Sequence, residues 1–433
     1  MDPVVISIIS IVIFLVLLAL GMHIGASLMV AGFIGMFLFR GFTVAVSELE
    51  TIAWGTVAKF SLAVIPLFML MGNFAMHSGI TKGLFDACYK WLGFFRGGLG
   101  FVAIGTSSLF HCFCGSATAT TATIGTICYP EMTRYNYKPV TSAAIIASSS
   151  AFGLLIPPSI GFIVYCMMSQ VSVGKMFAAG IVPAILVIIL SFITIVIMAR
   201  RDPESMPAGE KFTLKEKFAS LKGIIGFAIL FILVLVGIFR GWFSPSEGGA
   251  IGAAGSFVIM IVLRKASFKV IWICLKDSIK TTVMIFMIMI GANVFGTFLA
   301  MSQMPAKLAT TLSNMDTSPY VILWIVVFVY LILGMCIDTL PLITILTPIF
   351  WPLVLAMGWD PLWFGIVMVM CMLIGLISPP DGIPCYIMSS IAGVPLMSVF
   401  KACVPFLIML AAATVIFVYV QPLSTWLPNL LYG

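Results

Sequence analysis

The sequence predicts an all-α membrane protein that crosses the bilayer many times and contains two inverted repeats. Three observations lead to this fold class: the composition, two Pro-Pro pairs in apolar sequence, and the distribution of basic residues. Apolar residues make up 62% of the chain and charged residues 9%, with a mean hydropathy of +1.20. Soluble domains carry about 25% charged residues. The composition therefore excludes a water-soluble globule.

Apolar segments long enough to cross the hydrocarbon recur along the chain, and we expect roughly ten or more of them. Clear examples are residues 4–20, 180–198, 224–239, 249–263 and 404–420. The first is expected to remain as a span, because "MDPVV" lacks the positive region of a signal peptide. The ten cysteines have no metal-ligand spacing and are expected to be small buried hydrophobes.

Basic residues gather at the ends of the spans, which the positive-inside rule explains without an anionic partner. If the N-terminus is outside, most of the basic loops fall inside, and both termini are expected outside. The inside loops are residues 82–96, 134–138, 200–222 and 264–280, whereas Arg40, Lys175, Arg240 and Lys307 fall outside. Segment 200–222 is polar and is the one clear linker, near the middle of the chain.

An internal repeat appears when the sequence is shifted by 222 positions. The five prolines between residues 115 and 183 all recur at this offset: Pro130, Pro139, Pro157, Pro158 and Pro183 become Pro352, Pro361, Pro379, Pro380 and Pro405. Nine prolines occupy the 69 positions of the second window. Chance coincidence of all five is about 4 in 100,000 before allowing for the choice of offset.

The charges around the two copies indicate opposite orientations. Segment 101–130 is flanked by the inside charges Arg96, Arg134 and Lys138, so we expect a re-entrant hairpin that enters and leaves on the inner face. Its counterpart, 320–352, is flanked by Lys307, Asp316 and Asp360, on the face that the span count makes external. Inverted repeats of this kind are the construction of secondary transporters.

The Pro-Pro pairs predict helices that break within the membrane. Proline removes a backbone donor and clashes with the preceding turn, and non-helical backbone at membrane depth is tolerated only where it is buried or lines a cavity. Carbonyls freed at such breaks suit a hard cation such as sodium, and half-helix N-termini suit an anion. The alternative for a single proline is a simple kink.

Each hairpin is expected to turn at a polar tip. In the first, Gly115 and Ser116 lie in the hydroxyl-rich run "CGSATATTATIGT", although the distal Thr121, Thr123 and Thr126 could instead serve close helix packing. The offset places the second tip at "CIDTLP". Asp338 follows a long apolar run, where a charge is costly and by default functional. The alternative is a position in a short external loop.

The paired motifs resemble those of the large membrane subunit of tripartite ATP-independent periplasmic (TRAP) transporters. The resemblance rests on "GSATAT", "IPPSI", "AGIVP", "GMCIDTLP", "MGWDPLWFG" and "LIGLISPPDGIP", and covers nearly the whole chain. The first tip is also similar to that of sodium/divalent-anion symporters, but Ala117 stands where their motif has asparagine. Asp381 is either a ligand or the cap of the following half-helix.

The resemblance implies a sodium-coupled elevator-type importer of an organic acid, in the bacterial inner membrane with both termini periplasmic. It implies a separate small subunit of about four spans, a periplasmic binding protein and two or more sodium ions. The implied substrate ligands are Ser116, Ala117, Thr118, Ser159, Thr339 and Asp381. The implied sodium ligands are Gly115, Ser116, Gly153, Pro157, Asp338, Thr339, Gly375 and Ser378.

The implied organisation alternates scaffold and transport segments. Scaffold spans are expected over residues 1–97 and 173–300, with the cytoplasmic linker at 200–222, and a C-terminal span over 401–433. Transport repeat one is expected over 98–172, with a hairpin at 101–130 and a broken helix at 140–171. Transport repeat two is expected over 301–400, with a hairpin at 320–352 and a broken helix at 361–392.

Other classes remain as alternatives to this interpretation. A stand-alone sodium/di- or tricarboxylate symporter would share the hairpins and breaks. An intramembrane aspartyl protease would use Asp338 and Asp381 as a carboxylate pair, but has no need of inverted duplication. A channel does not need closed hairpins on opposite faces, and the chain has no phosphate-binding GxxxxGK[ST] motif and no feature that indicates nucleic acid binding.

The charge distribution yields a test of orientation. Residues 211–222 belong to the densest basic loop and should be cytoplasmic. A Lys215→Cys variant in intact cells should therefore resist an impermeant thiol reagent and react only after the membrane is opened. Labelling from the periplasmic side would contradict the predicted orientation of both repeats.

Overall fold

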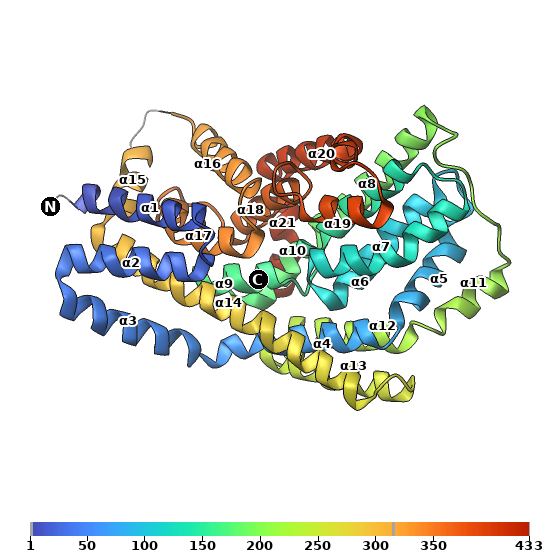
Figure 1. Ribbon diagram of the computed structural model, residues 1–433, viewed down its shortest axis with the longest axis horizontal. Helices are drawn as coiled ribbons and strands as arrows, with labels where there is room; N and C mark the ends of the chain where they lie inside the picture. Colours follow the sequence, from blue (N-terminus) through green and yellow to red (C-terminus); the bar gives the residue numbers. More distant parts are fainter. Residues whose placement is uncertain (1–2, 314–316, 433) are drawn as a thin grey trace.

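The computed structural model describes residues 3–313 and 317–432, and in this part of the chain all the regular elements are helices (Figure 1). The only β contact among these residues is an isolated bridge between Arg96 and Ala208. Met1, Asp2 and Asp316, which entered the expectations about the N-terminus and the second hairpin, lie outside the described residues. The all-α class expected from the sequence is confirmed.

Two sets of helices follow one another in the same order. The first set is α1 (Pro3–Ala19), α2 (Ile24–Arg40), α3 (Phe42–Val57), η1 (Phe60–Ala63), α4 (Val64–His77), α5 (Ile80–Leu92), α6 (Gly98–Cys114), α7 (Ala117–Arg134), α8 (Pro139–Ala151), η2 (Phe152–Leu154), α9 (Ile160–Ser169) and α10 (Val173–Arg201). The second set is α12 (Ile225–Phe239), α13 (Pro245–Val262), α14 (Phe268–Ser302), α15 (Met304–Ser313), α16 (Pro319–Gly334), α17 (Thr339–Ala356), α18 (Pro361–Leu376), α19 (Ile383–Ala392) and α20 (Leu396–Tyr419).

The repeat extends over almost the whole chain, well beyond the window where the prolines reveal it. A shift of 222 places α7 on α17 with identical bounds, and α1 on α12 with the same first residue. The other single-helix counterparts, α2 with α13, α5 with α15, α6 with α16, α8 with α18, α9 with α19 and α10 with α20, begin within two residues of the shifted position. The scaffold helices are therefore duplicated as well as the hairpins.

The largest difference between the two halves lies in one pair of counterparts. The second half has a single helix of 35 residues, α14, where the first half has α3, η1 and α4. The chain leaves the helical conformation at Lys59, whose φ of −70° and ψ of 117° are extended. The first arm, formed by α3, η1 and α4, is thus interrupted, whereas the second arm, formed by α14, is one continuous helix.

The hairpins turn, and the following helices break, at the same relative positions in both repeats. Gly115 adopts a left-handed φ of 61° between α6 and α7, and Asp338 precedes the first residue of α17. The Pro157–Pro158 and Pro379–Pro380 bonds, both cis, lie in the two breaks. The other repeated prolines are inside helices or at their first residue.

Packing between the halves follows the same symmetry. Helix α2 packs on α14 and α13 packs on α4, while α7 packs on α19 and α9 packs on α17. The second helix of each hairpin thus lies against the half-helix of the other repeat. Figure 1 shows the two hairpins on opposite sides of the molecule and α14 running across beneath them. This arrangement brings both tips to the middle.

Six of the described helices are long and apolar enough to cross a membrane, or seven if the bent pair α11 (Leu214–Leu221) and α12 counts as one span. Roughly ten or more apolar segments were expected. The difference arises partly because tips and breaks divide apolar segments into short helices such as α9 and α19, and partly because undivided helices such as α1 and α2 have only 17 residues. A single helix needs about 20 residues to span the hydrocarbon.

The linker and the C-terminal region are more structured than the sequence indicated. Helix α10 continues to Arg201, and α11 begins with a capping box of Thr213 and Glu216. Lys138 donates to Asp202 at 2.6 Å and holds the pKa of that carboxyl below its ordinary value, although an exposed pair of this kind adds little stability. After α20, the short helix α21 (Pro422–Tyr432) packs on α10.

Candidate transport site

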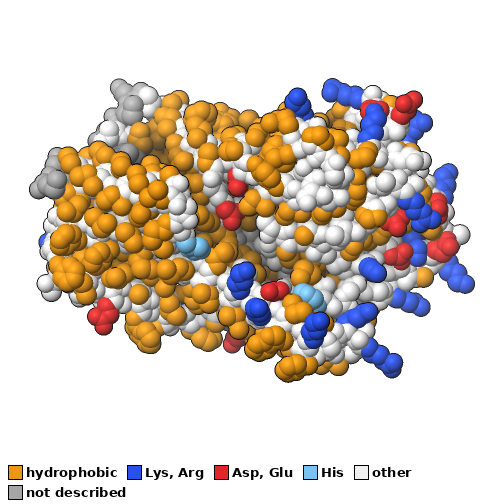
Figure 2. All heavy atoms as spheres, viewed as in Figure 1, with side chains coloured by type: hydrophobic (Ala, Val, Ile, Leu, Met, Phe, Trp, Pro, Cys, Tyr) orange, Lys and Arg blue, Asp and Glu red, His pale blue; other side chains and the backbone are white. Residues whose placement is uncertain are grey.

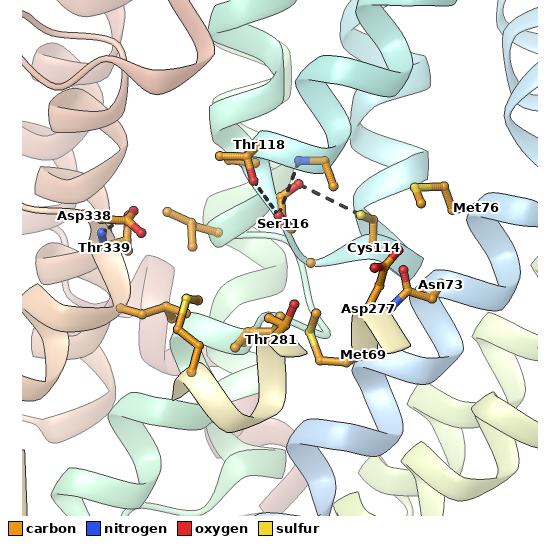
Figure 3. Close-up of a pocket in the computed structure, with 18 of the residues that line it drawn as sticks. Met69, Asn73, Met76, Cys114, Ser116, Thr118, Asp277, Thr281, Asp338 and Thr339 are labelled. Atoms are coloured by element: carbon orange, nitrogen blue, oxygen red, sulfur yellow. Dashed lines mark hydrogen bonds between the residues drawn. The ribbon is translucent and has the colours of Figure 1, made fainter. Parts of the chain in front are cut away.

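The two hairpin tips meet the scaffold at a central cavity of about 360 Å³. Its walls come from five places: α4, the first tip, the first break, α14, and the second tip with the end of α18. Figure 3 shows Asp338 and Thr339 on one side, Asn73 and Asp277 on the other, and Ser116 and Thr118 between them. The cavity therefore lies between the parts expected to be transport domain and scaffold.

The first tip presents hydroxyls at the start of α7. Ser116 caps this helix by accepting from the Ala119 N–H at 3.4 Å, and its hydroxyl is 3.0 Å from that of Thr118. Gly115, Ser116, Ala117 and Thr118 all line the cavity. Further along, Thr121 and Thr126 donate to carbonyls of their own helix. Thr121, Thr123 and Thr126 do not line the cavity. Thr121 is buried and Thr123 donates to Met76 Sδ on α4, which fits the packing interpretation for these two, whereas Thr126 is exposed.

The second tip places a carboxylate in the cavity. Asp338 and Thr339 both line it, and Asp338 caps α17 by accepting from the Thr339 N–H at 2.7 Å. Asp381 lies close enough to interact electrostatically with Asp338. One oxygen of Asp381, Oδ2, is buried and has no hydrogen-bond partner among the described residues. A buried carboxylate oxygen without a donor is costly unless a cation satisfies it.

The scaffold contributes polar groups that the sequence reading missed. Asn73 on α4 and Asp277 and Thr281 on α14 line the cavity, and Asn73 donates to Ser278 at 2.8 Å, which joins the two helices. A lone asparagine in "FMLMGNFAM" was an available signal. Asp277 was harder to recognise, because Lys276 and Lys280 flank it and the segment was interpreted as an inside basic loop.

The charge of the cavity wall has one sign. Asp277 and Asp338 line it, whereas no Lys or Arg does so among the described residues. Figure 2 shows acidic side chains at the hollow in the middle of this face, while Lys and Arg are concentrated at the end that carries α5 and α11. An organic anion placed in this cavity would meet the carboxyl groups of Asp277 and Asp338.

Six of the expected ligands do not line the cavity: Ser159, Asp381, Gly153, Pro157, Gly375 and Ser378. They lie at the two breaks, whose neighbours Leu154, Ile160 and Leu376 reach the wall. Ser159 and Ser378 donate to Leu154 and Ile374 carbonyls at 2.6 Å. The Gly375 carbonyl accepts from the Ser378 N–H at 3.0 Å. Its acceptor capacity is thus partly used within the break.

His111, on α6, connects the first break to the first hairpin and was also missed. Its Nε2 lies 2.7 Å from the Ser150 carbonyl, which can only accept, so Nε2 carries the proton. In the neutral ring Nδ1 then accepts from the Thr120 hydroxyl at 3.3 Å. The ring is fully buried and occupies the space that a Cβ at Gly153 would need. His111 thereby sets the position of α7 relative to the break.

Inverted repeats with facing hairpin tips, broken helices and a polar central cavity define a secondary-transporter permease. The chain matches the family model of the tripartite ATP-independent periplasmic transporter, DctM component, over residues 11–423, and it belongs to this family. The groups of three or more His, Cys, Asp or Glu that would hold a metal ion are not found among the described residues. The family assignment and the fold indicate a transport subunit and not an enzyme.

Characterised relatives carry several organic acids in their names. The C4-dicarboxylate TRAP transporter large permease protein DctM of Pseudomonas aeruginosa is 35% identical, over 86% of this chain and 87% of its own. The 2,3-diketo-L-gulonate permease YiaN of Escherichia coli is 30% identical over 94% and 95%. The sialic acid permease SiaM of Vibrio cholerae is 29% identical over 88% of each.

The fold also resembles that of a solved structure. The Alcanivorax borkumensis YdaH transporter, whose crystal structure reveals an unusual topology, aligns with a TM-score of 0.67. The alignment covers 87% of this chain and 88% of the YdaH chain, with 15% sequence identity. At this identity the likeness supports the fold alone.

The His111 bridge can be tested at Gly153. A Gly153→Ala change should displace the imidazole, cost about 1–3 kcal/mol as overpacked cores do, and lower sodium-dependent uptake. Thr120→Val keeps the shape and removes only the hydroxyl, so it should lower uptake with a smaller loss of stability. Melting in detergent and reconstituted uptake measure the two effects. Gly226→Ala, where a Cβ meets only ordinary contacts, is the control; equal behaviour of all three variants would contradict the bridge.

Proposed function

We propose that this chain is the large permease subunit of a sodium-coupled TRAP transporter in the bacterial inner membrane. Its substrate is an organic acid of the kind named for its relatives, such as a C4-dicarboxylate or a sialic acid. It works with a small membrane subunit and a periplasmic binding protein, as family membership implies. The observation that carries the proposal is the central cavity, where the facing tips present hydroxyls and the Asp338 carboxylate and no basic residue among those described lines the wall.

Sodium supplies the missing positive charge. Hydroxyls, carboxylates and freed carbonyls are hard oxygen donors suited to a small cation. Asp338 lines the cavity, and Asp381 presents a buried oxygen with no hydrogen-bond partner among the described residues. A cation near these carboxylates offsets their desolvation and allows an anionic substrate to bind against Ser116 and Thr118. Ion and substrate binding are thereby coupled, because each lowers the electrostatic cost of the other.

Transport proceeds by an elevator movement of the hairpins and broken helices against the scaffold. The cavity borders Asn73 and Asp277, near the ends of α4 and α14 that the basic loops place on the cytoplasmic side. The arrangement is therefore the cytoplasm-facing one. In the other state the same tips face the opposite half of the scaffold.

The sodium gradient is sufficient for accumulation without ATP. One net charge moving inward at about 120 mV releases about 2.8 kcal/mol. Each roughly tenfold sodium gradient adds about 1.4 kcal/mol. Two sodium ions with one monoanion therefore supply about 5.6 kcal/mol, which supports a gradient of about ten-thousandfold.

The partner requirement is tested by reconstitution. Proteoliposomes with this chain, the small subunit and the binding protein are supplied in turn with succinate, 2,3-diketo-L-gulonate, isethionate and N-acetylneuraminate under a sodium gradient. One of the acids should accumulate only when all three proteins and sodium are present. Robust uptake by the isolated chain would instead identify a stand-alone symporter.

The role of Asp338 is tested in the same assay. Asp338→Asn keeps the shape and removes the charge, so the sodium concentration for half-maximal uptake should rise about tenfold or more, or uptake should be lost. Asp381→Asn is measured alongside, because either of the two carboxylates can make the larger contribution to sodium binding. Asp360→Asn is the matched control, since Asp360 only caps α18 by accepting from Leu362 and Trp363 N–H groups. Wild-type sodium dependence in both Asp338 and Asp381 variants would remove these carboxylates from the coupling.

A further inference from the structure

A second polar cavity, of about 200 Å³, lies on the opposite half of the scaffold from the transport site. Thr56, Lys59 and Ser61 contribute from the joint between α3 and α4, Asn293 from α14, and Gln170 from the end of α9. Its only charged lining residue among those described is Lys59. No carboxylate in the described part of the chain forms an ion pair with Lys59.

The internal repeat relates this cavity to the central one. Thr56 and Lys59 are the counterparts of Ser278 and Thr281 at the offset of 222. The hydroxyls of Ser278 and Thr56 each accept a hydrogen bond from an asparagine on the helix packed against them. Asn73 of α4 donates to Ser278 at 2.8 Å, and Asn293 of α14 donates to Thr56 at 3.0 Å. The two cavities therefore use equivalent surfaces of the two scaffold halves.

The equivalent surfaces differ in charge. The surface in the central cavity carries Asp277 and Thr281, whereas the second surface has Gly55 and Lys59 at these positions. A carboxylate is therefore repelled by the first surface and attracted by the second. In a symmetric two-state mechanism the tips face each surface in turn. The substrate would meet a fixed positive charge in one state and a fixed negative charge in the other.

We infer that the second cavity is an anion-binding subsite for the acidic group of the transported acid, with Lys59 as its counter-charge. This inference rests on the proposed function. The ammonium forms a charge-assisted hydrogen bond, and the Thr56 hydroxyl, which accepts from Asn293, still has a proton to donate. By the predicted orientation the subsite is on the periplasmic half, so Lys59 favours loading and Asp277 favours release on the inner side.

The test is Lys59→Gln in the complete three-protein proteoliposome, supplied with whichever of the four acids the wild type accumulates. The KM for the acid should rise about tenfold or more, as loss of a charge-assisted bond implies, while half-maximal sodium, measured at a saturating concentration of the acid for each variant, stays within about twofold. Lys59→Arg should restore most of the affinity. Lys307→Gln is the matched control, because Lys307 is exposed, as Lys59 is, but lines none of the cavities described.

A second measurement separates substrate binding from docking of the binding protein. Equilibrium dialysis of the same acid against the two purified membrane subunits should show weaker binding for Lys59→Gln than for wild type. An unchanged KM, or an altered KM with unchanged dialysis, overturns this inference and leaves the proposed function intact. A wild-type complex that takes up none of the four acids overturns both.

Discussion

The structure depends on one constraint: a backbone or carboxylate group that is buried away from water must find a partner. Each hairpin tip and each proline break exposes helix-end groups in the middle of an apolar protein. Local groups satisfy part of this need, as Ser116 does for α7 and Asp338 for α17. Local groups leave Asp381 Oδ2 without a hydrogen-bond partner among the described residues, and the proposed sodium ion would satisfy it.

The same constraint explains why two repeats are necessary. The tip of one repeat forms only part of the cavity wall, and the tip of the other repeat and the helices α4 and α14 form the rest. The packing of α7 on α19 and of α9 on α17 brings the helix that begins at each tip against a half-helix of the other repeat. Ligand groups from residues more than 200 positions apart in the chain therefore converge on one cavity, which includes Ser116 and Asp338.

The tips could be found in the sequence because their signals are local and chemically conspicuous. A hydroxyl-rich run and a lone aspartate stand out against apolar neighbours, and paired prolines mark the breaks. The scaffold half of the site could not be found in this way. Asp277 lies between two lysines, so its segment was interpreted as a basic loop. His111 acts through contacts with Ser150 and Thr120 that only the fold creates.

The extent of the repeat was also hidden from the sequence, for a physical reason. Scaffold helices need only be apolar and closely packed, so many side chains serve equally well at each position. Helix bounds are retained when residue identities are not, as α1 and α12 illustrate. The prolines survived at matching positions because each fixes a local backbone geometry that other residues do not provide.

The unequal scaffold arms have a mechanical consequence. Helix α14 is one continuous rod of 35 residues, about 52 Å long at 1.5 Å per residue, and such a rod bends only gently. The other arm is interrupted at Lys59, where extended backbone separates α3 from η1. If both arms bend during transport, the bending of the first arm is concentrated at this interruption. This interruption of the helical backbone carries the lysine of the second cavity, so bending at the interruption also moves the charge of Lys59.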